Sequence, residues 1–271
     1  MNGFLKSALC AVALTAAGCG GGDKKPDGAA PAKPAAGKPA AAAPAGGAAY
    51  DAAKSTASVK GVVKWTGPKP AQTTIQMSSD TVCQSHAGPG VANPKFVVAD
   101  GGGLPNAFVW ALEGPHKGMT GFPEPAAVTV DQVGCMYTPH VVGLRVNQKF
   151  TVKNSDNTTH NVHVRPKSGG ELNQAQSVGQ HNEFSFAAKE KAIPFNCDIH
   201  TWMSAFAFVL DHPFFSATDA NGNFEVKGLP AGTYKFKVWH ESFIADKREM
   251  ETDFEVTVKD GETVTKDVEL K

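Results

Sequence analysis

Three residues with metal-binding side chains lie within one short stretch of the chain, C-D-I-H-T-W-M: Cys197, His200 and Met203. A fourth, His160, lies upstream in N-S-D-N-T-T-H-N-V. Thiolate, imidazole and thioether donors together suit a soft or borderline metal ion. If the four act together, the chain must fold so that this loop meets a distant segment that carries His160. The alternative is a buried cysteine, a surface histidine and a core methionine that are close by chance, and the loop spacing alone does not decide between the two.

The sequence that leads to His160 resembles the cupredoxin family of blue-copper proteins. Over 137–160 it reads Y-T-P-H-V-V-G-L-R-V-N-Q-K-F-T-V-K-N-S-D-N-T-T-H. In that family an aromatic residue, a proline, two strands separated by a turn and an N-x-D motif precede the first histidine ligand. The later stretch I-P-F-N-C-D-I-H-T-W-M-S-A-F-A-F-V-L resembles the amicyanin type, whose ligand loop has the same short spacing. The residues in register with the family pattern are Tyr137, Pro139, Val142, Phe150, Asn154, Asp156 and His160.

The resemblance implies a Greek-key β-sandwich that holds one type 1 copper ion. In such a site two histidines and a cysteine form a trigonal plane, and a methionine makes a long axial contact. Asn161 matches the family asparagine that ties the two ligand loops together. The chain departs from the pattern at Asn147, which replaces a turn glycine, and at Ile199, which replaces a frequent proline. Carried over position by position, the copper ligands are His160, Cys197, His200 and Met203.

The resemblance also implies a route for electrons. In the family the histidine on the short ligand loop has an edge at the protein surface, so we expect His200 to have solvent-accessible ring atoms. Trp202 has no donor for copper and is either a plug over the site or part of the patch that contacts a partner. The expected partner is another redox protein, such as a cytochrome or an oxidoreductase.

The front of the chain has the pattern of an exported lipoprotein. Residues 1–18 carry one early charge and a short apolar run, as a secretory signal does. The A-A-G-C at 16–19 resembles a bacterial lipobox with Cys19 as the acylated residue, and simple cleavage is the alternative. The Ala-, Pro- and Gly-rich segment 19–57 lacks apolar surface to bury, so we expect a disordered tether. These features predict a periplasmic or cell-surface protein that is held to a membrane only by its lipid.

Cysteine usage fits an exported chain. Of the five cysteines, one lies in the signal segment, one at the lipid site and one in the ligand loop. The remaining two, Cys83 and Cys135, would normally form a disulfide in an oxidising compartment. The alternative is a second metal site, whose residues would be Cys83, His86, Cys135, Met136 and His140.

Beyond the tether, roughly 210 residues remain, enough for one large or two small domains. The 26 basic and 26 acidic residues give no net charge, and no basic stripe occurs, so a nucleic-acid partner is not expected. Short alternating runs between turn residues predict an all-β fold, with no long helical period. The expected strands are 59–65, 107–112, 127–132, 141–146, 149–153, 206–210, 223–226, 233–239 and 253–258.

The tail, 218–241, resembles the carboxypeptidase-regulatory-like, prealbumin-type β-sandwich. It contains the hairpin turn Asn221-Gly222 and the connecting turn L-P-A-G at 229–232. The tail supplies few strands for a whole sandwich, and 58–112 resembles the missing first strands. We therefore expect three segments: 58–112 completing the C-terminal sandwich, the cupredoxin domain at 113–211 inserted into it, and the sandwich proper at 212–271. The alternative is a tandem arrangement, in which 58–112 extends the cupredoxin domain.

These features favour a copper protein that carries single electrons between redox partners. Four ligands leave no open coordination position for a substrate, and no catalytic sequence motif occurs, so we do not expect an enzyme. The alternatives are a copper-binding or storage protein without a redox partner, and a surface-binding or adhesion module. The other sandwich histidines are expected at the surface or hydrogen-bonded within the fold: His116, His163, His181, His212 and His240.

Overall fold

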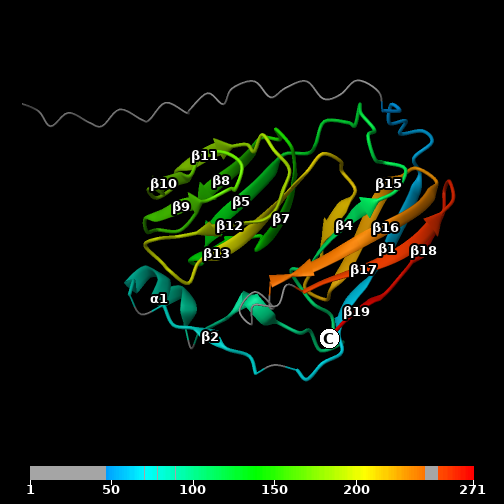
Figure 1. The fold of residues 1–271 in the computed structure, drawn as a ribbon. Coiled ribbons are helices and arrows are strands. Elements are labelled where there is room, and N and C mark those ends of the chain that lie inside the picture. The colour runs from blue at the N-terminus through cyan, green and yellow to red at the C-terminus, as the bar shows by residue number, and fades with distance from the viewer. Residues whose placement is uncertain (1–46, 70, 78, 89, 242–249) are drawn as a thin grey trace, which may run out of the picture. The chain divides into compact units, whose positions relative to one another are not determined.

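The computed structural model describes residues 47–241 and 250–271, except 70, 78 and 89. The signal segment 1–18, the lipid-site residue Cys19 and the tether as far as residue 46 lie outside the described residues. The described chain is an all-β protein made of two β-sandwiches (Figure 1). Among the described residues, no helix has the length and hydropathy needed to cross a membrane.

We call the first the terminal sandwich, because its strands come from both ends of the described chain. One sheet has the order β15-β1-β18, with β19 also paired to β1, and the other has the order β14-β4-β16-β17. Its strands are β1 (Ala57–Trp65), β4 (Phe108–Glu113), β14 (Phe215–Ala217), β15 (Asn223–Leu229), β16 (Gly232–His240), β17 (Met250–Val258), β18 (Thr263–Thr265) and β19 (Val268–Leu270).

The second, which we call the inserted sandwich, lies between β4 and β14 in the chain. Its sheets have the orders β10-β9-β12-β13-β7 and β11-β8-β5-β6. Its strands are β5 (Val128–Val133), β6 (Met136–Thr138), β7 (Val141–Arg145), β8 (Phe150–Asn154), β9 (His160–Val164), β10 (Leu172–Gln176), β11 (His181–Phe184), β12 (Glu190–Asn196) and β13 (Ser204–Leu210).

The strand pairings are those that the nested arrangement requires. β1 pairs antiparallel with β15, and β4 pairs antiparallel with β16, so strands from the front of the chain complete both sheets of the tail. Burial alternates along these strands as a sandwich requires, because successive side chains of a strand point to opposite faces. In β15, Phe224, Val226 and Leu229 are buried while Glu225 and Lys227 are exposed.

Part of the segment 58–112 does not complete the C-terminal sandwich as expected. Between β1 and β4 the chain forms β2 (Thr74–Ile75), α1 (Thr81–Ala87), β3 (Val91–Ala92) and a 3-10 turn (Pro94–Phe96). Ile75, Met77 and Cys83 are buried in the core of the inserted sandwich, not of the terminal one. α1 was not expected, because a helix of seven residues is too short to show a helical period.

The expected tether 19–57 also ends earlier in the structure than the sequence indicates. The Tyr50 backbone N–H donates to the oxygen of Thr120 at 2.8 Å, and its hydroxyl donates to the oxygen of Gly228 at 3.0 Å. Its ring lies 5.1 Å from the ring of Phe122. A single aromatic residue in an Ala-rich segment therefore fixes the last part of that segment to the fold.

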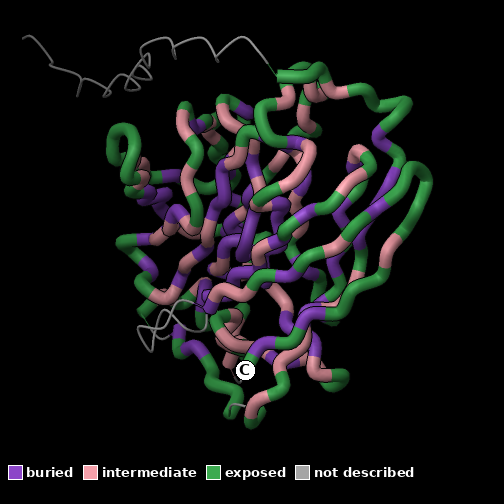
Figure 2. The backbone as a smooth tube through the Cα atoms, turned by 45° about the vertical axis from the view of Figure 1, so that its right-hand side comes forward, coloured by how far each residue is buried: buried purple, intermediate pink, exposed green. Residues whose placement is uncertain are grey.

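Aromatic side chains from both sandwiches pack against one another. Phe208 of β13 stacks on Phe108 of β4 with ring centroids 4.0 Å apart, and the ring of Trp239 in β16 lies 5.0 Å from Phe208. Gly143 in β7 allows this close approach, because a Cβ there would lie 2.3 Å from the ring of Phe215. In Figure 2 the buried residues run along strands in the interior of the molecule, and the exposed residues gather at its periphery.

We expect Phe208→Ala to lower the free energy of unfolding by about 3–5 kcal/mol, as removal of a fully buried aromatic ring does. Denaturant unfolding followed by tryptophan fluorescence measures this loss. The matched control is Val178→Ala, since Val178 is 56% exposed and should change stability by less than about 0.5 kcal/mol. Equal effects of the two substitutions would contradict the packing described here.

Candidate metal centre

Adjacent strands bring the four sequence-predicted ligands to one end of the inserted sandwich. His160 begins β9, Cys197 follows the last residue of β12, and His200 and Met203 lie in the turn before β13. β12 pairs with β9 through Asn196 and His163, and with β13 through Asn196 and Ser204. The sheet order β9-β12-β13 thus places residues distant in sequence at one edge.

Three donor atoms converge in the interior. The Nδ1 atoms of His160 and His200 are 2.9 Å apart, and the Cys197 Sγ lies 3.8 Å from the Nδ1 of His200. All three donors lie within 4.8 Å of one another, and Cys197 is the only free cysteine among the described residues. Met203 is fully buried in the same core. The structure therefore brings together the three in-plane donors that the sequence predicts.

The ligand loop is closed by its own backbone. The N–H of Met203 donates to the oxygen of His200 at 2.9 Å, and the N–H of Cys197 donates to the oxygen of Met203 at 3.3 Å. The N–H of His200 donates to the Cys197 sulfur at 3.3 Å. The loop thus holds its donors in place by local hydrogen bonds.

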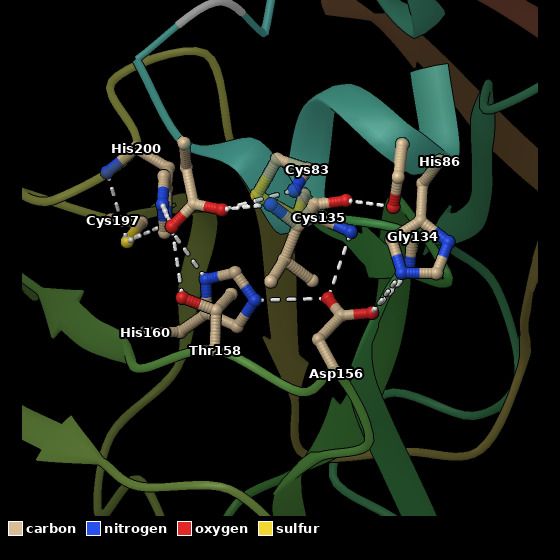
Figure 3. Close-up of a disulfide and its surroundings, with 12 residues drawn as sticks. Cys83, His86, Gly134, Cys135, Asp156, Thr158, His160, Cys197 and His200 are labelled. Carbon is tan, nitrogen blue, oxygen red and sulfur yellow. Dashed lines mark hydrogen bonds and ion pairs between the residues drawn. A yellow bond between two sulfur atoms is a disulfide. The ribbon is translucent and has the colours of Figure 1, made fainter. Parts of the chain in front are cut away.

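Each histidine has a carboxylate on its other ring nitrogen (Figure 3). The Nε2 of His160 lies 2.9 Å from an oxygen of Asp156, and the Nε2 of His200 lies 3.3 Å from an oxygen of Asp80. A carboxylate accepts a hydrogen bond from Nε2–H, so in the neutral imidazole the Nδ1 carries a lone pair. Two lone pairs and a sulfur then face one buried point, an arrangement that a bound cation stabilises.

The protonation states suit metal binding. Burial lowers the pKa of His160, against the hydrogen bond to Asp156, so this imidazole is neutral at pH 7. The backbone N–H of Cys83 lowers the pKa of Asp80 to about 2, with smaller contributions from Thr158 and His200, while burial opposes the shift. A neutral imidazole and an ionised carboxylate are the states that a carboxylate–histidine–metal arrangement uses.

The expectation of a solvent-accessible His200 is wrong. His200 is only 1% exposed, because Asp80 and α1 lie over its ring. Asp80 caps α1 by accepting from the N–H groups of Val82 and Cys83 at 2.7 and 3.0 Å. The cover comes from a segment far from the ligand loop in sequence, and a reading of the loop alone does not reveal it.

Cys83 and Cys135 form the expected disulfide. It joins α1 to the turn between β5 and β6, and both residues are fully buried. The bond uses both thiols, so they are not available for the alternative second metal site. His140, another member of that alternative, instead pairs with Glu241 at 2.6 Å.

Asn161 and Asp198 join the two ligand segments. The Asn161 Oδ1 accepts from the Asp198 backbone N–H at 2.6 Å, which is the tie between loops that the sequence predicts. The Asp198 carboxylate also forms a hydrogen bond with His163 Nδ1 at 2.7 Å. This hydrogen bond is the main cause that raises the pKa of His163, and a second hydrogen bond, with Glu171, raises it further. His163 therefore supports the loop that follows Cys197, a role that sequence reasoning missed.

Trp202 is half-buried rather than fully exposed. Its indole N–H donates to the oxygen of Cys135 at 3.1 Å, and its ring lies 5.1 Å from that of His200. Trp202 thus packs between the disulfide and the ligand loop. This position fits a plug over the site better than a patch that contacts a partner.

His116 departs from the expectation of a surface or hydrogen-bonded histidine, whereas its neighbour His212 accepts from the backbone N–H of Phe214 at 3.2 Å. Both are buried, with ring centroids 4.4 Å apart, and burial lowers their pKa values to about 4 and about 3. Neither ring nitrogen of His116 has a hydrogen-bond partner among the described residues, although the backbone of Ala111 lies near enough to raise its pKa slightly. His116 is therefore buried without the hydrogen bonds that the sequence interpretation assumed.

Comparison with known proteins gives partial likenesses. No protein-family model and no curated protein matches the chain. Among solved structures, it is similar to a copper-containing nitrite reductase from Thermus scotoductus SA-01, at 21% identity over 33% of this chain and 24% of that one, with a TM-score of 0.30. It is also similar to a variant of amicyanin in the Cu(I) form, at 21% identity over 31% of this chain and 81% of that one, with a TM-score of 0.29. At these TM-scores the likenesses assign neither a family nor a function.

Proposed function

We propose that the protein binds one copper ion in a type 1 site and carries single electrons. The observation that carries this proposal is the convergence of two imidazole Nδ1 atoms and the Cys197 sulfur in the buried end of the inserted sandwich. The ligands are His160, Cys197, His200 and Met203, in agreement with the cupredoxin-like sequence pattern.

The donor set favours copper over other metals. Two imidazoles and a thiolate in one plane with a thioether are the donors of a blue-copper site. Structural zinc usually takes four cysteine or histidine ligands, and a thioether is a poor substitute. Calcium and magnesium prefer oxygen ligands, whereas the carboxylates near His160 and His200 contact the Nε2 atoms behind the point where the three donors meet.

The rigidity of the site favours electron transfer over catalysis. Both imidazoles are held from behind by carboxylates, and the ligand loop is closed by backbone bonds. Bound copper would supply the one-electron chemistry, while these residues fix its geometry and exclude water. With four protein donors, no position is left for a substrate, so we propose a carrier rather than an enzyme.

Copper binding without a redox partner is a second candidate, favoured by the burial of His200. A covered imidazole edge lengthens the path from copper to a docked protein. Against this candidate, one site per chain is a small capacity for storage. A surface-binding role for the terminal sandwich, which has a carboxypeptidase-regulatory-like sequence pattern, has no specific observation in its favour.

We further propose that the protein is exported and lipid-anchored at Cys19, and that its partner is a redox protein such as a cytochrome. The support is the lipobox-like A-A-G-C and the Ala/Pro/Gly-rich segment after it.

The native protein should partition into detergent, and Cys19→Ala should release it or stall its processing. Mass spectrometry of the native N-terminus measures the lipid. An unmodified N-terminus that begins after residue 19 would contradict the proposal of a lipid anchor.

Addition of Cu(II) to the mature protein should give an intense visible band from thiolate-to-copper charge transfer. Cys197→Ser should abolish this band, because the charge-transfer donor is lost. Visible and electron-paramagnetic spectra measure both outcomes. Val178→Ala is the control, since this exposed side chain should leave the band unchanged. A band that survives Cys197→Ser would move the site elsewhere.

The copper-loaded protein should show a reversible one-electron wave at an electrode, because its ligands need little rearrangement between oxidation states. Met203→Gln should keep the copper and shift the potential, since the axial ligand tunes it. Stable copper binding without a reversible wave would favour the second candidate.

A further inference from the structure

The two histidines of the candidate copper site are supported in matching ways. Asp156 accepts from the backbone N–H groups of Gly134 and Cys135, at 2.7 and 2.8 Å, and contacts His160. Asp80 accepts from the backbone N–H of Cys83 at 3.0 Å and contacts His200. Each carboxylate is therefore held by the backbone of one disulfide cysteine.

The disulfide joins these two supports. Cys83 and Cys135 have Cα atoms 5.5 Å apart, and both are buried beside the ligand histidines. Two further groups of potential ligand atoms lie beside the proposed copper position. One group is His200, Asp80 and Cys83, and the other is His160, Asp156 and Cys135. Within each group the ligand atoms lie within 4.8 Å of one another. The covalent link thus spans the two carboxylate–imidazole pairs (Figure 3).

Asp80 differs from Asp156 in its origin. Asp156 precedes His160 by four residues in the same loop, whereas Asp80 precedes α1, in a segment outside the ligand-bearing strands. The second oxygen of Asp80 also accepts from the hydroxyl of Thr158 at 2.9 Å, which directs that oxygen toward His200. Its geometry is thus fixed by α1 on one side and by the His160 loop on the other.

We propose that Asp80 is a positioning residue of the copper site. It accepts a hydrogen bond from the Nε2–H of His200 and so keeps the Nδ1 lone pair directed at Cys197 and His160. The α1 segment, anchored by Cys83–Cys135, is then a functional part of the metal centre rather than only a cover. This inference rests on the proposed copper site, but the tautomer of His200 is a property of the protein before metal is bound.

The test substitutes Asp80→Asn in the full mature protein. The side-chain oxygen of asparagine can still cap α1, while its amide presents a donor to His200 Nε2. In the metal-free protein, nitrogen NMR of His200 should shift from the Nε2-protonated tautomer toward the Nδ1-protonated one. Copper affinity, measured by competition with a chelator of known affinity, should fall roughly 10- to 100-fold, as for other carboxylates behind ligand histidines.

Two further variants make the outcome decisive. Asp80→Ser keeps a good helix cap but is too short to reach His200, so it should weaken copper binding without imposing the opposite tautomer. Asp100→Asn is the matched control, since Asp100 is an exposed aspartate that pairs with Lys69 at 3.5 Å. This substitution should change neither the His200 tautomer nor the copper affinity.

An unchanged His200 tautomer and unchanged copper affinity in both Asp80 variants would overturn the proposal and leave Asp80 as a helix cap only. If the wild-type protein binds no copper, the proposed function fails. In that case the NMR reading on the metal-free protein still decides the role of Asp80.

Discussion

Two imidazole lone pairs and a sulfur that face one buried point are the constraint on which this structure depends. Polar groups buried without partners are costly, so every other polar atom of these residues must be satisfied. The Nε2 atoms of His160 and His200 are satisfied by Asp156 and Asp80. Those carboxylates are in turn satisfied by backbone N–H groups, two of which belong to the disulfide cysteines. The donor cluster therefore has two layers of support, the carboxylates and the backbone N–H groups that hold them.

The nested topology supplies the outermost layer. β1 and β4 belong to different sheets of the terminal sandwich, and the connection between them forms α1 over the metal end of the inserted sandwich. The Phe108–Phe208 stack and the buried His140–Glu241 pair join the same two sandwiches elsewhere. Breaking the chain into separate domains would thus remove Asp80 from His200 as well as the shared aromatic core.

The sequence predicts the parts of the site that depend on local patterns. Alternation locates the main strands, and the spacing of Cys197, His200 and Met203 identifies the ligand loop. Asn147 adopts the left-handed conformation, with φ of 62°, that its match to a turn glycine implies. The expectation that His200 is exposed is wrong because Asp80, which covers its ring, is distant from the ligand loop in sequence. An aspartate before T-V-C is an ordinary helix cap, and only the disulfide to Cys135, near the N-x-D loop, could have indicated that α1 reaches the metal end.

Closure of the site has two opposed consequences for electron transfer. Excluding water from His200 would lower the rearrangement around a copper ion bound at the proposed site, which would favour fast exchange of an electron. The same closure removes the imidazole edge from the surface, so a partner on this side meets α1 and Asp80, whose side chain is 22% exposed. Asp80 thus places an anion beside the covered imidazole of His200. Electrostatic attraction of a cationic surface acts mainly on the encounter rate and weakens as salt is added. A closed, carboxylate-held site can therefore remain a carrier where an open site relies on apolar contact, and the carrier role does not require His200 itself to be exposed.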